Sequence, residues 1–86
     1  MTIKKLAEKV YTVYTDYDPF NFPFDDVTVD TIAEEIESLD STITEELWEI
    51  AQCYYESEEY QKQHDILLIA RNIEKYQMKK RFERKA

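Results

Sequence analysis

Apolar residues recur every three or four positions along most of the chain, which is the period of an amphipathic α-helix. We predict a first helix over residues 1–17, with an apolar stripe that consists of Ile3, Leu6, Val10, Val13 and Tyr17. The segment 11–15 is also rich in strand-forming residues. An extended second half therefore stays open as an alternative, although the helix is favoured.

Two prolines interrupt the pattern after this helix. Pro19 and Pro23 break a helix and bias the residues before them toward extended backbone. We predict a loop over residues 18–29, in which three phenylalanines alternate with polar or proline positions. The loop either folds its rings over the helical core or exposes them as an aromatic docking patch.

A second helix is predicted over residues 30–40. Asp30 is the expected N-cap, because a short acidic side chain can accept a hydrogen bond from the first turn. The three-four spacing then continues through Val29, Ile32, Ile36 and Leu39.

A third helix is predicted over residues 44–57. Ile43 and Trp48 have the spacing of a hydrophobic staple around a Thr44 cap, while Thr42 and Glu45 offer a competing capping box. The expected buried stripe of this helix is Leu47, Ile50, Ala51 and Tyr54.

A long fourth helix is predicted over residues 58–85, after a polar turn that lacks the glycine common at helix ends. Its expected inner side is Tyr60, Leu67, Ala70, Ile73 and Tyr76. We expect Trp48 and Tyr54 to pack in the core against this helix, and the basic tail 79–85 to lie outside it. The predicted fold is all-α, with residues 1–86 as one domain of about four helices that ends in an antiparallel helical hairpin.

Composition narrows the functional classes. The chain has 86 residues, enough for one small core, and no glycine, which argues against phosphate-binding loops. Its single cysteine, Cys53, excludes an internal disulfide and favours a reducing compartment. No apolar stretch approaches the length of a transmembrane helix, so we expect a soluble, cytoplasmic protein with no membrane partner.

Charge is distributed unevenly along the chain. Residues 10–61 contain fifteen carboxylates and no lysine or arginine, whereas residues 62–86 contain eight basic side chains and three acidic ones. This acidic middle is either a solvated surface that favours solubility or a surface for a basic partner. Carboxylates three or four residues apart on a helix lie about 5–6 Å from one another, so a helical protein can imitate the charge spacing of nucleic acid.

Residues 47–70 resemble one tetratricopeptide repeat, a family of helix pairs with apolar, small and tyrosine residues at fixed offsets. The matching residues are Leu47, Ile50, Ala51, Tyr54, Tyr55, Tyr60, Leu67 and Ala70. Glu58 replaces the family's turn glycine, and Gln63 replaces a small residue of its second helix. The resemblance implies an antiparallel helical hairpin, because a single repeat cannot bury both of its faces.

A longer part of the chain is similar to a helical module of antirestriction-associated proteins from plasmids, transposons and phages. The similarity lies in residues 6–11, in the motif Asp16-Tyr17-Asp18-Pro19-Phe20 and in residues 73–76 at the end of the acidic helices. This resemblance implies a gene that travels on a mobile element. It implies no chemistry for any residue.

The titratable residues give no catalytic or metal-binding set. His64 and Cys53 could form a nucleophilic pair, but no oxyanion-binding segment accompanies them. We expect a surface histidine and a small buried thiol instead. Adjacent acidic pairs such as Glu34-Glu35 point about 100° apart on a helix and do not share a site. We therefore expect no enzyme, no cofactor and no metal.

The sequence predicts a small acidic, non-enzymatic inhibitor from a phage or mobile element. It would bind the basic nucleic-acid site of a host defence nuclease, as antirestriction and anti-CRISPR proteins and DNA mimics do, and would not bind nucleic acid itself. The expected partner-binding residues are Glu34, Glu35, Glu37, Glu45, Glu46, Glu49, Glu56, Glu58 and Glu59. One alternative is an interaction module whose hairpin 44–78 docks a partner helix, and a weaker one is a nucleic-acid regulator that acts through the basic tail.

Overall fold

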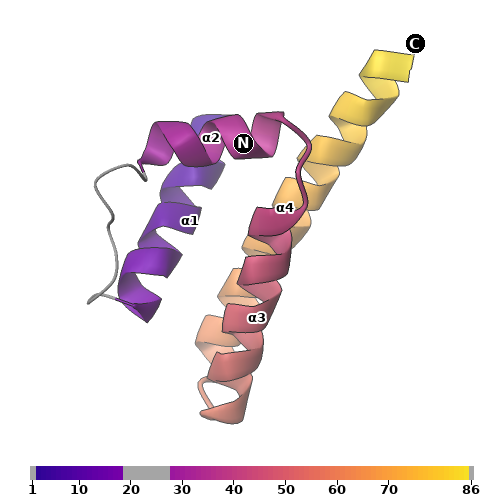
Figure 1. Ribbon diagram of the computed structural model, residues 1–86. Helices are drawn as coiled ribbons and strands as arrows, with labels where there is room; N and C mark the ends of the chain where they lie inside the picture. Colours follow the sequence, from indigo (N-terminus) through magenta and orange to yellow (C-terminus); the bar gives the residue numbers. More distant parts are fainter. Residues whose placement is uncertain (1, 19–27, 86) are drawn as a thin grey trace.

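The computed structural model describes residues 2–18 and 28–85, and this part of the chain forms four α-helices and no strand. They are α1 (Ile3–Tyr17), α2 (Val29–Glu37), α3 (Thr42–Glu56) and α4 (Tyr60–Lys85), as Figure 1 shows. The predicted all-α fold is confirmed, and residues 11–15 are helical rather than extended. The predicted phenylalanine loop falls mostly on residues 19–27, which lie outside the described residues.

The helices form two pairs. α3 and α4 run antiparallel side by side, and α1 and α2 pack on each other and on one side of this hairpin (Figure 1). α4 has 26 residues, so its length is about 39 Å. It therefore accounts for most of the longest dimension of the molecule, 44 Å, and its last turns project beyond the other helices (Figure 1).

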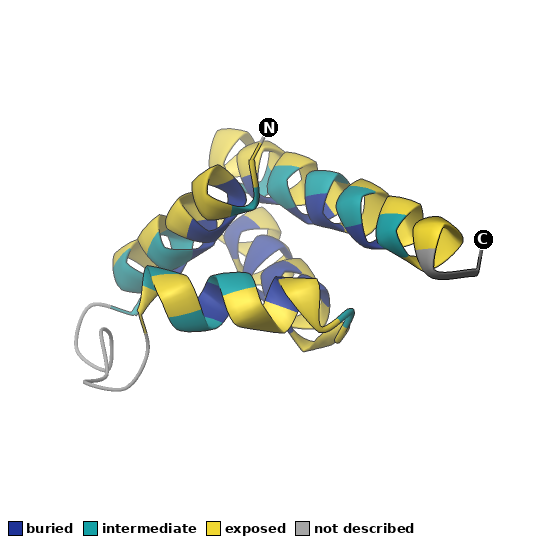
Figure 2. Cartoon of the chain, turned by 90° about the horizontal axis from the view of Figure 1, so that it is seen from above, coloured by how far each residue is buried: buried dark blue, intermediate teal, exposed yellow. Residues whose placement is uncertain are grey.

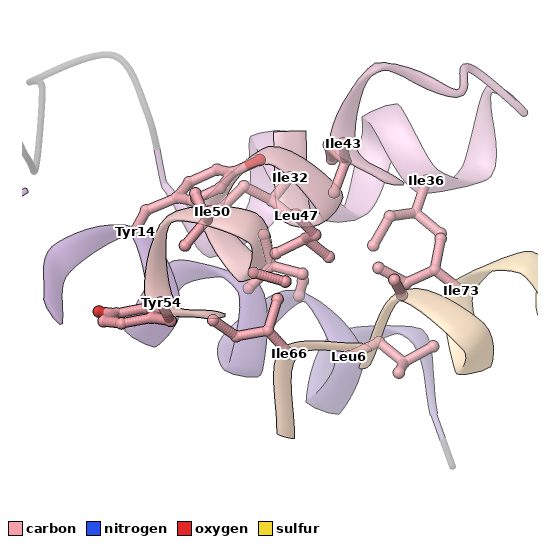
Figure 3. Close-up of a cluster of buried hydrophobic side chains, with 14 residues drawn as sticks. Leu6, Tyr14, Ile32, Ile36, Ile43, Leu47, Ile50, Tyr54, Ile66 and Ile73 are labelled. Carbon is pink, nitrogen blue, oxygen red and sulfur yellow. The ribbon is translucent and has the colours of Figure 1, made fainter. Parts of the chain in front are cut away.

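The core lies between the two pairs, where the buried stripes of all four helices meet (Figure 2). Figure 3 shows how the larger of these side chains interdigitate. The buried apolar residues are Leu6, Ala7, Val10, Tyr14, Ile32, Ile36, Ile43, Leu47, Ile50, Ala51, Tyr54, Ile66, Ala70 and Ile73. Most of the predicted core is therefore confirmed, including Tyr54 against α4.

Three residues that we expected inside the hairpin are instead on its surface. Trp48 is 46% exposed, Tyr60 is 55% exposed and Leu67 is 38% exposed. The physical reason is rotation of the helices, because successive residues are about 100° apart. Leu47 and Ile66 take the inward directions, so their neighbours Trp48 and Leu67 point away from α1 and α2.

In α1 the inward stripe is also rotated from the expected one. Ala7 and Tyr14 are buried, whereas Tyr17 is 42% exposed. Ile3 and Val13 are only partly buried at the edge of the core. The small Ala7 lets a neighbouring helix approach, and Tyr14 buries its ring while its hydroxyl reaches a carboxylate.

The helix starts differ from the predicted ones by a few residues. α2 begins at Val29, and its N-cap is Thr28 rather than Asp30, which lies in the first turn. The Thr28 hydroxyl accepts a hydrogen bond from the Thr31 N–H at 3.2 Å, and the Thr31 hydroxyl accepts one from the Thr28 N–H at 2.8 Å. This reciprocal capping box satisfies two backbone donors at once.

α3 begins at Thr42, two residues before the predicted start. The Asp40 carboxylate accepts a hydrogen bond from the Thr42 N–H at 2.9 Å, which fixes the chain just before the helix. Ile43 and Thr44 therefore lie inside α3 and are buried. The expected staple between Ile43 and Trp48 does not form, because Trp48 faces the opposite way.

Both short connections use a non-glycine residue in the left-handed region, which follows from the absence of glycine. Leu39 after α2 has φ 66° and Glu58 after α3 has φ 63°. The Glu58 N–H donates to the Tyr55 carbonyl at 3.0 Å, and the Glu59 N–H donates to the Tyr54 carbonyl at 2.8 Å. This is the bonding of a Schellman motif, which normally favours glycine. Leu39, expected on the helical stripe, is therefore part of the turn.

Polar side chains of α4 hold the C-terminal end of α2. The side-chain amide of Gln77, which is buried, donates to the Ile36 carbonyl at 3.2 Å and to the Asp40 carbonyl at 3.0 Å. Arg81 donates to the Leu39 carbonyl at 3.1 Å. The Ile36 carbonyl also accepts a hydrogen bond from the Leu39 N–H at 3.2 Å. The bonds from Gln77 and Arg81 therefore add donors from α4 to the end of α2 and to the turn after it, and they fix α2 against the hairpin.

Candidate protein-binding surface

All nine carboxylates of the predicted binding surface are exposed. They are distributed over α2, the outer side of α3 and the turn between α3 and α4. The nine are Glu34, Glu35, Glu37, Glu45, Glu46, Glu49, Glu56, Glu58 and Glu59. We call them the acidic surface.

Almost all of this charge is unneutralised by the protein itself. Among the described residues, Glu59 is the one member of the acidic surface in an ion pair, at 3.4 Å from Lys62. Four others engage neutral groups instead. The hydrogen bonds run from Tyr14 to Glu46, from Tyr76 to Glu37, from Ser41 to Glu45 and from Gln52 to Glu56.

Glu35 and Glu46 interact where α1, α2 and α3 meet. The Tyr14 hydroxyl donates to Glu46 at 2.6 Å, and burial together with this bond raises the pKa of Tyr14. Partial burial, followed by repulsion from Glu46 and Asp40, raises the pKa of Glu35. This junction therefore concentrates negative charge in a way that the sequence did not predict.

Other members of the acidic surface lie in different surroundings. Glu37 accepts a hydrogen bond from the Tyr76 hydroxyl, and burial with this bond raises the pKa of Tyr76 to about 12. Glu59 shares Lys62 with Asp16, whose carboxylate lies 3.8 Å from the ammonium group. The structure thus brings Glu35 and Glu46 together but distributes the remaining carboxylates over two helices and a turn.

The hairpin carries a second surface feature, which sequence reasoning missed. Eight large hydrophobic residues are exposed in the described part of the chain, and seven of them lie on α3 or α4. We call these seven the hairpin outer face: Trp48, Tyr55, Tyr60, Leu67, Leu68, Met78 and Phe82. The sequence of α4 could have indicated this surface, because its apolar residues lie on two sides of the helix and a single buried stripe needs only one.

Two adjoining pockets run along this face between α3 and α4. One has a volume of about 370 Å³ and the other about 330 Å³, and both are lined by Trp48 and Glu74. The second also contains Thr44, which is 3% exposed and whose hydroxyl has no hydrogen-bond partner among the described residues. Buried polar atoms without a partner are rare, so the Thr44 hydroxyl is an unfavourable feature of the described chain.

The residues considered for nucleophilic chemistry are separated by the fold. Cys53, expected to be buried, is exposed and accepts a hydrogen bond from the Tyr17 hydroxyl of α1 at 3.2 Å. His64 lines the pocket beside Trp48 on the other side of the hairpin. The exposure of Cys53 has a geometric cause, since it is one residue before the inward-facing Tyr54.

The described residues form neither a metal centre nor a membrane-spanning helix. No group of three or more potential metal ligands lies together in residues 2–18 and 28–85. None of the helices in this part of the chain is long and apolar enough to span a membrane.

Comparisons with protein-family models, with curated proteins and with solved structures gave no match for this chain.

Proposed function

We propose that this protein is a non-enzymatic inhibitor that binds the basic nucleic-acid site of a nuclease through its acidic surface. The observation that supports this proposal best is the set of exposed carboxylates on α2 and α3 that form no ion pair within the described chain. Such charges are available for a cationic partner, and their mutual repulsion is relieved when that partner binds.

The rigidity of the surface supports the same function. Glu35 and Glu46 are carried by two different helices that pack on one core, and the Tyr14 hydrogen bond orients Glu46. A fixed array of carboxylates costs less entropy on binding than flexible side chains do. It also steers a positively charged partner during diffusion, which mainly accelerates association.

The proposed biological setting follows from the resemblance of the chain to modules of mobile-element antirestriction proteins. In that setting the target is a restriction or RNA-guided nuclease of the bacterial cell, and the inhibitor occupies the channel that otherwise holds nucleic acid. The proposed protein has no catalytic residue, cofactor or metal of its own, and acts in the cytoplasm of the cell that contains the element.

The test is inhibition of DNA cleavage by purified restriction endonucleases and RNA-guided nucleases. The informative variant is Glu34→Lys with Glu49→Lys, because neither side chain makes a hydrogen bond or ion pair within the described residues. We avoid Glu46, whose bond to Tyr14 supports the fold. Each exposed charge contributes about 0.2–1 kcal/mol, and reversal adds repulsion, so we expect inhibition to weaken by about tenfold or more at low salt.

The matched control is Glu8→Lys with Asp65→Lys. It changes the net charge of the protein by the same amount as the test variant, but the two substitutions lie on α1 and α4, outside the acidic surface. We expect this variant to retain most of the inhibition. An equal loss in both variants would show that only net charge matters, and no inhibition of any nuclease by the wild type would overturn the proposal.

A further inference from the structure

The hairpin outer face carries large apolar side chains along its centre, and the carboxylate of Glu74 lines both pockets between them. Trp48 and Tyr55 are two helical turns apart on α3, and Tyr55 contacts Tyr60 edge to face, with ring centroids 5.6 Å apart. On α4, Leu67 and Leu68 lie beside Trp48 in one pocket, and Met78 lies beside it in the other. Among the described residues no other helix covers this side of the hairpin (Figures 1 and 2).

The two edges of this face carry opposite charges. Along α3 the exposed flank consists of Glu45, Glu49 and Glu56, and α3 contains no lysine or arginine. Along α4, Arg71 lines the pocket with Trp48, and Lys75 follows one turn later on the same side. Two copies of such a face are complementary when the acidic edge of one copy lies on the basic edge of the other, so that the apolar strips meet between them.

We propose that the hairpin outer face binds a second copy of this chain, with the two hairpins related by a two-fold axis parallel to α3 and α4. Rotation about such an axis exchanges left and right, so the acidic α3 of each copy meets the basic α4 of the other. A two-fold axis perpendicular to the helices would instead place acidic α3 on acidic α3. Charge therefore selects the first arrangement, which is a closed, isologous dimer.

The register of the hairpin supports the same pairing. A rotation about an axis parallel to the helices leaves every residue at its own height. Trp48 is level with Leu67 and Arg71 within one chain, so it is also level with these residues of the second copy. Glu45 and Glu49 then face Lys75 and Arg71 of the second copy, and the apolar strips meet in the middle as in a four-helix bundle.

The exposed ring of Trp48 favours an occupied face. A partly exposed tryptophan at the centre of an apolar strip is also typical of the residues that dominate binding energy at interfaces. The dimer engages Glu45 and Glu49, which also belong to the acidic surface, so it would compete with a nuclease for these two carboxylates. It is tested without any nuclease.

Sedimentation equilibrium of the purified protein over a wide concentration range tests the proposal. We expect the wild type to approach twice the chain mass. Trp48 is the only tryptophan, so its fluorescence should shift to the blue over the same concentration range as it loses contact with water. A wild type that remains monomeric at millimolar concentration would overturn the proposal.

Exchange of the charges across the interface distinguishes this dimer from non-specific hydrophobic association. Arg71→Glu with Lys75→Glu should weaken the dimer by about tenfold or more, and the addition of Glu45→Lys with Glu49→Lys should restore most of it. Lys5→Glu with Lys9→Glu on α1 is the matched control and should leave the dimer unchanged. The proposed arrangement would be contradicted if the quadruple variant dimerised no more tightly than the Arg71→Glu, Lys75→Glu variant while its circular dichroism spectrum remained native. A monomeric wild type whose Trp48 fluorescence shifts on addition of a basic amphipathic peptide would show a partner helix as the occupant instead.

Discussion

Glu58 occupies a backbone conformation that penalises every residue except glycine, so Glu58→Gly should stabilise the protein. With φ at 63°, the Cβ of Glu58 lies close to the backbone carbonyl, which costs roughly 1–2 kcal/mol for an L-residue. The Glu58 side chain is exposed and makes no hydrogen bond or ion pair within the described residues. Removal of the Glu58 side chain therefore breaks no hydrogen bond or ion pair of the described residues.

The net effect is smaller than the strain, because glycine also makes the unfolded chain more flexible. That entropy opposes the gain by roughly 0.4–1 kcal/mol. We therefore expect the free energy of unfolding to rise by roughly 1 kcal/mol, which corresponds to a rise in Tm of roughly 4–8 °C for a domain of this size. Urea unfolding followed by circular dichroism at the helical band measures this directly.

Two control variants isolate the cause. Glu58→Ala removes the same charge and side chain but keeps the Cβ, so it should lack most of the gain. Glu49→Gly removes the same charge but places glycine in the middle of α3, and should lose roughly 0.5–1 kcal/mol. The explanation would be refuted if Glu58→Gly were no more stable than Glu58→Ala.

Three further predictions test other parts of the fold. Thr44→Val should raise the free energy of unfolding by about 1 kcal/mol, since it removes a buried hydroxyl without a described partner. Thr31→Val should instead lower the free energy of unfolding by about 1 kcal/mol, because it breaks the capping box. Thermal melts compare the two variants, and an equal loss of stability in both would contradict this prediction. Gln77→Leu should cost about 1–3 kcal/mol, because the Asp40 carbonyl loses this donor and the Ile36 carbonyl keeps only the Leu39 N–H. An unchanged urea midpoint would count against the bonds. Glu35→Gln should raise Tm slightly at neutral pH: the pKa of Glu35 is raised in the folded protein, so its ionisation weakens folding as pH rises. The gain should vanish as the pH falls below the ordinary carboxyl value of 4.5, and melts in which it persisted there would disprove the cause.

The sequence predicted the helices well because their stripes are long, but it did not predict their rotation. Trp48 shows why. Its size and spacing fit a core position, yet Leu47 next to it fits equally well, and only the packing against α1 and α2 decides which of them points inward. The same competition separates Ile66 from Leu67. Local pattern gives the period of a helix, whereas the direction of its buried side depends on the partners.

Turns were predictable only in part. The polar residues 56–59 predicted a turn without the usual glycine, and the structure places Glu58 of this turn at a positive φ, which the sequence analysis did not predict. The N-caps were less predictable, since Thr28, Asp30 and Thr31 are all acceptable capping residues by type. The Gln77 bonds to the end of α2 join residues about forty positions apart, and no local pattern contains that information.

The acidic surface was predictable as a set of exposed residues, because polar positions outside an apolar stripe face water. Its internal arrangement was not. The approach of Glu35 to Glu46 depends on how α2 and α3 pack around Tyr14. The hairpin outer face was missed for a related reason, since Trp48, Tyr60 and Leu67 were assigned to a core in which Leu47 and Ile66 take the inward positions.

The most direct test of the proposed function is competition between this protein and DNA for one nuclease. A nuclease whose cleavage the protein inhibits is loaded with fluorescent duplex DNA without the metal ion needed for cleavage, and the wild type is titrated in. Mutually exclusive binding through the acidic surface predicts complete loss of the DNA anisotropy. It also predicts a midpoint that rises in proportion to the DNA concentration and a much weaker effect of Glu34→Lys with Glu49→Lys. A stable ternary complex, in which DNA remains bound at saturating protein, would contradict the proposed mechanism.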